Sequence, residues 1–166
     1  MKSLIAIICI LGIVGIIAAT SVKAADTATV AATVTVQNIS VSVSDGSINY
    51  GVLALSSTKS TCDLSDTQIL TNDGNVPEIF NIKGNDSANW TLGATAGANV
   101  YVHKFSANAC PWATGTGTAL TTNYQTLASA VPAGGASNLN LQINTPTSST
   151  SFAPQSVDVT ILAIMQ

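Results

Sequence analysis

The chain has 166 residues, enough for one domain; 46% of them are hydrophobic, only 8% are charged, and the formal net charge is −3. With five basic residues and no arginine, it lacks the basic patch that binds phosphate backbones or anionic lipid, which argues strongly against nucleic-acid binding. Its polarity comes from 52 serine, threonine and asparagine residues, and because disorder needs low hydrophobicity with high net charge, we expect a folded protein with a neutral surface.

The first 24 residues have the order of a secretory signal. Lys2 precedes an apolar run over residues 4–19, and Val22 and Ala24 stand at the −3 and −1 positions of a cleavage site after Ala24. We therefore expect a signal peptide over residues 1–24, a single domain over residues 25–166, and a secreted or cell-surface location. The alternative is an uncleaved N-terminal anchor, although this run is shorter than the about 20 residues that a membrane span needs.

Residues 27–37 alternate with period two, which predicts a strand with one buried face. The apolar face carries valines and the other face carries threonines: Val30, Val34 and Val36 against Thr29, Thr33 and Thr35. Two hypotheses follow for its partner. The segment pairs within its own domain, or it donates a strand to the sheet edge of another subunit.

Downstream of residue 37, short apolar runs alternate with turn-forming residues at spacings near ten. A turn at Asp45-Gly46 would join the first of these runs to the preceding segment as a hairpin. The run over residues 119–130 also fits a helical spacing, but its threonine content favours a strand. Without helical crossovers the pattern predicts an all-β fold, an antiparallel β-sandwich of about 9–10 strands. The expected strands cover residues 27–37, 48–55, 67–71, 78–83, 89–95, 100–105, 119–130, 138–144 and 157–165.

Signal cleavage would leave two cysteines, Cys62 and Cys110. An even pair in an exported chain predicts a disulfide. The bridge would close a loop of about 49 residues and stabilise the fold by about 4 kcal/mol in the chain-entropy model. The alternative, in which both thiolates and His103 hold a metal, has no CxxC or HxH spacing to support it.

Candidate catalytic groups are sparse. His103 is the one histidine and lies in an alternating run between aromatic residues, where packing is the ordinary role. The sequence has no GxSxG elbow, HExxH motif or glycine-rich phosphate loop. The nearest carboxylate pairs, Asp63 with Asp66 and Asp73 with Glu78, lie in turn-rich segments where such residues bind backbone groups. We expect no enzymatic activity.

The sequence is compatible with two kinds of ligand, calcium and a glycan. Loop oxygens from Asp73, Asn75 and Asp86 make weak calcium candidates, although neither an EF-hand nor a calcium repeat is present, and we otherwise expect no cofactor. Trp112 follows Cys110-Pro111 in a loop and is a possible ligand contact for a glycan. Trp90 is in phase with Leu92, so we expect it to be part of the core.

Several segments resemble the WxL-type cell-surface domains of Gram-positive bacteria. They are DGSINYGVL over residues 45–53, the Trp90-Thr91-Leu92 motif, and the closing stretch that ends in SVDVTIL. The resemblance implies an all-β exported domain that associates non-covalently with the cell wall through Trp90 and Leu92. A second Trp-x-Leu motif belongs to that family, and here Val159-Thr160-Ile161 stands in its place.

Together these features predict a non-catalytic cell-surface protein with a structural or adhesive role. Its partners would be cell envelope components or copies of itself. A low-charge surface favours such association because little charge repulsion keeps neighbours apart. The alternatives are a filament subunit that donates strand 27–37, and a small glycan-binding module.

Overall fold

The computed structural model of the protein describes residues 26–166. The signal peptide expected over residues 1–24 lies outside the described residues. Residues 35–166 form one compact unit, which we call the domain, and the described residues 26–34 belong to a separate unit. The described residues form ten strands and one turn of helix, so the all-β prediction is confirmed.

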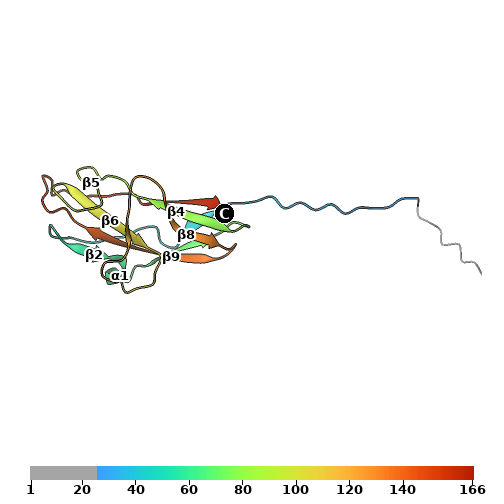
Figure 1. The fold of residues 1–166 in the computed structure, drawn as a ribbon, viewed down its shortest axis with the longest axis horizontal. Helices are drawn as coiled ribbons and strands as arrows, with labels where there is room; N and C mark the ends of the chain where they lie inside the picture. The colour runs from blue at the N-terminus through green and yellow to red at the C-terminus, as the bar shows by residue number, and fades with distance from the viewer. Residues whose placement is uncertain (1–25) are drawn as a thin grey trace, which may run out of the picture. The chain divides into compact units, whose positions relative to one another are not determined.

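The domain contains two sheets that make a sandwich (Figure 1). All strand pairs are antiparallel except β5 with β6, which is parallel. The first sheet has the order β1 (Val41–Val43), β3 (Gln68–Asn72), β9 (Ala136–Asn144), β6 (Val100–Ser106) and β5 (Thr91–Leu92), with β2 (Thr58–Ser60) on β9 and β7 (Thr118–Ala119) on β6. The second sheet has the order β10 (Thr160–Met165), β4 (Glu78–Lys83) and β8 (Gln125–Val131).

The core lies between the two sheets, and the period-two pattern of the sequence accounts for it. In β4 every second residue is buried, which places Phe80 and Ile82 in the core. The other members of this core cluster come from β3, β6, β8, β9 and the segment before β8: Leu70, Phe105, Leu120, Val131, Leu139 and Leu141.

A short helix, α1 (Thr61–Leu64), was not expected from the sequence. Ser60 caps it, because its hydroxyl accepts from the Asp63 N–H while the Asp63 carboxylate accepts from the Ser60 N–H. The hydrogen bonds from the Ser60 side chain and backbone lower the pKa of Asp63. The helix carries Cys62, and the predicted disulfide to Cys110 is confirmed, with the two Cα atoms 5.4 Å apart.

Two strand predictions near the start of the chain were wrong. Residues 27–37 form no strand, and the first strand begins at Val41. Residues 48–55 form no strand either, so β1 pairs with β3 and not with a hairpin partner. Alternation alone does not make a strand, because the backbone also needs a free sheet edge beside it.

Several later strands differ from the prediction in their bounds. The expected strand over residues 89–95 shrinks to the two residues of β5, and the ambiguous run over 119–130 becomes β8. A positive φ at Asn99 falls directly before β6, and one at Ala130 falls within β8 near its end. The final strand starts at Thr160, three residues later than expected, and β9 starts two residues earlier.

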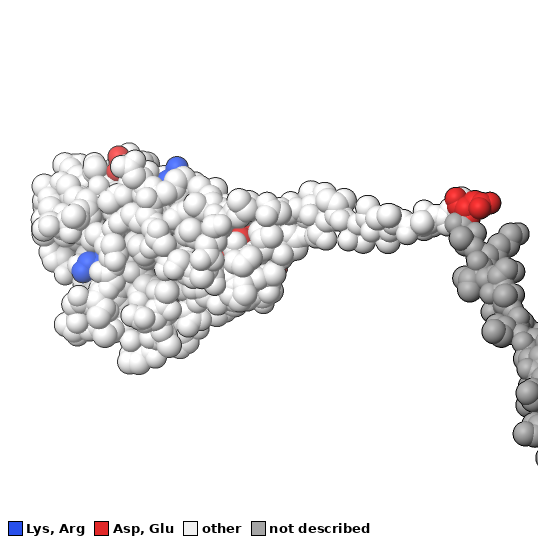
Figure 2. Space-filling view, turned by 45° about the vertical axis from the view of Figure 1, so that its right-hand side comes forward, with Lys and Arg blue, Asp and Glu red and all other residues white. Residues whose placement is uncertain are grey.

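The surface of the protein is neutral over most of the face that Figure 2 shows, where charged side chains are few and widely separated. This agrees with the charged fraction of 8%. Among the described residues, no helix has the length and apolar character needed to cross a membrane.

Candidate functional site

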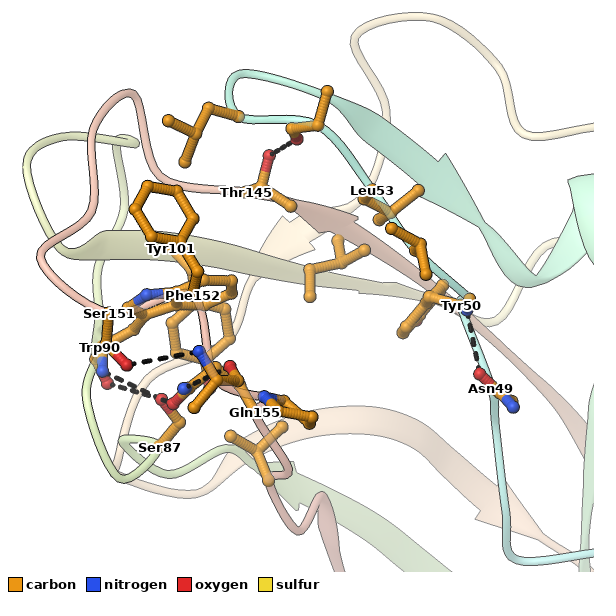
Figure 3. Close-up of a pocket in the computed structure, with 18 of the residues that line it drawn as sticks. Asn49, Tyr50, Leu53, Ser87, Trp90, Tyr101, Thr145, Ser151, Phe152 and Gln155 are labelled. Carbon is orange, nitrogen blue, oxygen red and sulfur yellow. Dashed lines mark hydrogen bonds between the residues drawn. The ribbon is translucent and has the colours of Figure 1, made fainter.

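A groove of about 490 Å³ lies at one end of the domain. One wall is residues 48–55, the other wall is residues 151–157, and the floor comes from Trp90, Tyr101 and Ile143. Figure 3 shows Trp90, Phe152 and Gln155 on one side of the cavity and Tyr50 and Leu53 on the other. The two walls are extended loop segments to which no strand is assigned.

The wall over residues 48–55 is fastened to the first sheet by two side chains. The Tyr50 hydroxyl lies 2.9 Å from Nε2 of His103 on β6. Thr145, just after β9, donates from its hydroxyl to the Ala54 carbonyl at 2.7 Å and accepts from the Ser57 N–H at 2.9 Å. Burial, together with the charge of Asp66, raises the pKa of Tyr50. The hydroxyl therefore stays protonated and available to this hydrogen bond.

The opposite wall is held by a small amide and hydroxyl network. Gln155 Oε1 accepts from the Ser87 hydroxyl at 2.8 Å and from the Asn89 N–H at 3.1 Å. The indole N–H of Trp90 donates to the Ser149 hydroxyl at 2.9 Å, which positions the ring at the groove. Both walls are thus tied to the sandwich by neutral hydrogen bonds while the space between them stays open.

The groove offers apolar contact and neutral polar groups, with no charged side chain in its lining. Val52 and Phe152 on the two walls are 102% and 82% exposed, which leaves large apolar surfaces facing water. His103 lies behind Tyr50 with 3% of its surface exposed, and burial lowers its pKa to about 4. Such a site suits the binding of an uncharged, partly apolar chain.

The structure brings one of the predicted site residues into the groove and leaves the others elsewhere. Trp90 is half-buried and lines the floor, while Leu92 packs against the core, close to Gly84. Trp112 is also half-buried; its ring packs against Gly117 beside a separate pocket of about 80 Å³. The role of Trp112 as a ligand contact therefore stays a prediction. The pocket beside it is much smaller than the groove.

Two of the three calcium candidates, Asp86 and Asn75, use their side chains in hydrogen bonds to the backbone. Asp86 accepts from the Leu92 N–H at 2.7 Å, and the Asn75 carboxamide binds Val36 and Asn38. Asp73 lies in the same turn, where its own N–H donates to Ser40. Within residues 26–166 no group of three or more His, Cys, Asp and Glu side chains gathers in a way that could hold a metal ion.

The carboxylates that are neighbours in the sequence make separate hydrogen bonds. Asp66 accepts from the Gln68 side chain at 2.6 Å, while Asp63 caps α1. Glu78 is fully buried; one oxygen accepts from the Ser40 N–H at 2.9 Å and the other has no partner among the described residues. These contacts tie the three acids to neighbouring backbone and side-chain groups of the domain.

Sequence reasoning missed the groove and most of its lining. The signal was present in part, since INYGVLAL over residues 48–55 is apolar-rich yet contains Gly51, whose φ is +73°. A positive φ is foreign to a regular strand. Phe152 was a second signal, as a lone aromatic in a low-complexity loop. Comparisons of the chain with family models, curated proteins and solved structures gave no significant match.

Proposed function

We propose that the protein is an exported, non-catalytic surface subunit that assembles with copies of itself through residues 27–37. The observation that carries this proposal is the exposure of the apolar face of that segment. Val30, Val34 and Val36 are 88%, 89% and 80% exposed, and the segment forms no strand. Burying three valines releases about 1.5–3 kcal/mol each, which gives association a driving force.

The chemistry of the segment supports strand donation. Every second residue from Ala28 to Val36 is apolar, and residues 27–44 contain no charge. β-branched valine and threonine favour extended backbone, and the segment's N–H and C=O groups gain partners when it pairs with a sheet edge. The Cys62–Cys110 disulfide supports an oxidising, extracellular setting for this assembly.

The test compares charge substitutions on the two faces of the segment in the purified protein. Val30→Lys with Val34→Lys places two charges on the apolar face, and Thr29→Lys with Thr33→Lys places the same two charges on the opposite face. We expect the wild type and the threonine variant to form extended assemblies by electron microscopy and light scattering, and the valine variant to remain monomeric. A monomeric wild type, or equal assembly by both variants, contradicts the proposal.

Attachment to the cell wall is a second candidate, which the resemblance to WxL-type domains suggests and the partial exposure of Trp90 favours. Sedimentation of the protein with purified peptidoglycan tests it. Loss of cosedimentation in Trp90→Ala, with retention in Trp112→Ala, is the expected result. Equal cosedimentation of both variants with the wild type argues against a role for Trp90.

A further inference from the structure

We infer that the groove between residues 48–55 and 151–157 is the acceptor for residues 27–37 of a second copy of this chain. This inference rests on the proposed function and adds to it the place where the donated strand binds. Four observations carry it: the unused backbone groups of the walls, the matching chemistry of groove and segment, the position of the groove, and the shape of the segment.

The walls of the groove have backbone groups with no partner. Residues 52–55 and 156–158 donate no backbone N–H to any described residue. Peptide groups beside an apolar groove are stabilised when an extended chain pairs with them. The second wall also leads directly into β10, an edge strand of the second sheet, so a strand laid against it extends that sheet.

The groove and the segment match in charge and in polarity. The lining residues are all uncharged, as are residues 27–37. No charge therefore loses its hydration when the segment enters the groove, and the usual penalty for burying an ion does not arise. The valines would cover the exposed side chains of Val52 and Phe152, which removes apolar surface from water on both partners.

The shape of the segment also fits. Its apolar face consists only of alanine and valine, namely Ala28, Val30, Ala32, Val34 and Val36, so it is narrow and has small side chains. The floor and walls supply the large ones, Trp90, Tyr101 and Phe152. Small side chains that pack against large ones fill an apolar interior without voids.

The groove lies at the end of the domain opposite to the point where the chain enters it. Residues 36–38 are held by Asn75, and the Gln166 N–H donates to Pro77, so both lie near the β3–β4 turn. The groove wall over residues 151–157 precedes β10, whose six residues span about 20 Å toward Gln166. In Figure 1 the C-terminus and β5, which adjoins the groove floor, lie at opposite ends of the domain.

This placement determines the kind of assembly. A donor at one end and an acceptor at the other make a heterologous contact, which repeats from copy to copy and gives an open filament. The expected product is therefore a chain of subunits and not a closed dimer.

The test is a disulfide cross-link between two singly substituted copies. A Val34→Cys copy is mixed with a Val52→Cys copy under mild oxidation, and heterodimers are separated without reductant. Both valines are exposed in the domain or its leading segment, so neither substitution removes a core contact. We expect a cross-linked heterodimer for this pair and none when Tyr124→Cys, which is exposed but outside the groove, replaces Val52→Cys.

A second measurement separates this inference from the proposed function. Phe152→Lys places one charge in the groove, and Tyr124→Lys places the same charge outside it, beside Lys83, as the control. We expect loss of filaments in the groove variant and retention in the control. Loss of assembly in the Val30 and Val34 variant, with normal assembly in the groove variant and no cross-link, overturns the groove as acceptor while strand donation stands. Cross-linking within one copy, seen in a doubly substituted monomer that does not assemble, also overturns it.

Discussion

The Tyr50 hydroxyl lies 2.9 Å from Nε2 of His103, and this contact fastens the groove wall over residues 48–55 to the first sheet. Nδ1 of His103 is buried and has no hydrogen-bond partner among the described residues. The ring is therefore accommodated in its neutral form, with one nitrogen bound to Tyr50. The groove wall and the protonation of a buried histidine are linked through this one hydrogen bond.

Stability should fall as the pH falls from about 6.5 to about 4. Burial lowers the pKa of His103 to about 4, so in this window the unfolded chain binds a proton that the folded chain does not. The free energy of unfolding then decreases toward acid, by about 3 kcal/mol over the whole window. Urea titrations at pH 7 and pH 4.5 measure the difference.

His103→Gln is the variant for that experiment, because it removes the titrating ring. We expect the loss of stability between pH 6.5 and pH 4 to shrink strongly in the variant. The Asp63 carboxyl also has a lowered pKa and acts in the same direction at lower pH, where its stabilisation is lost as it becomes protonated. An unchanged pH dependence in the variant would show that other groups dominate.

Loss of the disulfide should destabilise the domain by about 4 kcal/mol. Cys62 and Cys110 are 48 residues apart, and their link restricts the unfolded chain. The double variant Cys62→Ser with Cys110→Ser, compared with the wild type under oxidising conditions, tests this by thermal unfolding. Equal melting temperatures would contradict it, and addition of reductant to the wild type should reproduce the shift.

Gly117→Ala should cost more stability than Gly115→Ala. Both glycines have positive φ, +83° and +77°, so both variants carry the left-handed backbone penalty of about 1 kcal/mol. A Cβ atom at residue 117 would also meet the Trp112 ring, whereas a Cβ atom at residue 115 would have no other atom within 4 Å. We expect a further loss of about 1–3 kcal/mol from this overpacking, measured by urea unfolding. Equal losses would mean that the ring moves away freely.

Asn75 should control the order of the chain where it enters the domain. Its Oδ1 accepts from the Asn38 N–H and its Nδ2 donates to the Val36 carbonyl, both at 2.8 Å. Asn75→Ala removes both contacts, and Asn75→Asp keeps the acceptor for Asn38. Hydrogen exchange at the Asn38 amide should be faster in the alanine variant than in the aspartate variant. The same exchange rate in both variants and the wild type would rule out this anchoring role.

Much of the sandwich was predictable because its strands satisfy local rules. Residues 78–83 alternate cleanly and are β4 in full, and the run over 138–144 lies within β9. The disulfide followed from cysteine number and compartment. The helix α1 was missed because a single capped turn has too few residues to show a helical period.

Neither the groove nor the pairing of residues 27–37 could be predicted from the sequence. Alternation in residues 27–37 identifies a chain that is able to form a strand, but it does not say which edge it joins. The same limit applies to residues 48–55, which are apolar enough for a strand and instead form a groove wall. Pairing depends on which edges the rest of the fold leaves open.

The sequence by itself determined the fold class, the neutral surface and the disulfide, because periodicity, composition and cysteine number are local or additive properties. Only the tertiary structure decided which strands pair, that the valines of residues 27–37 stay exposed, and that an uncharged groove opens between two loop segments. Sheet pairing joins residues far apart in the chain, so the edges and cavities that remain are set by the whole fold.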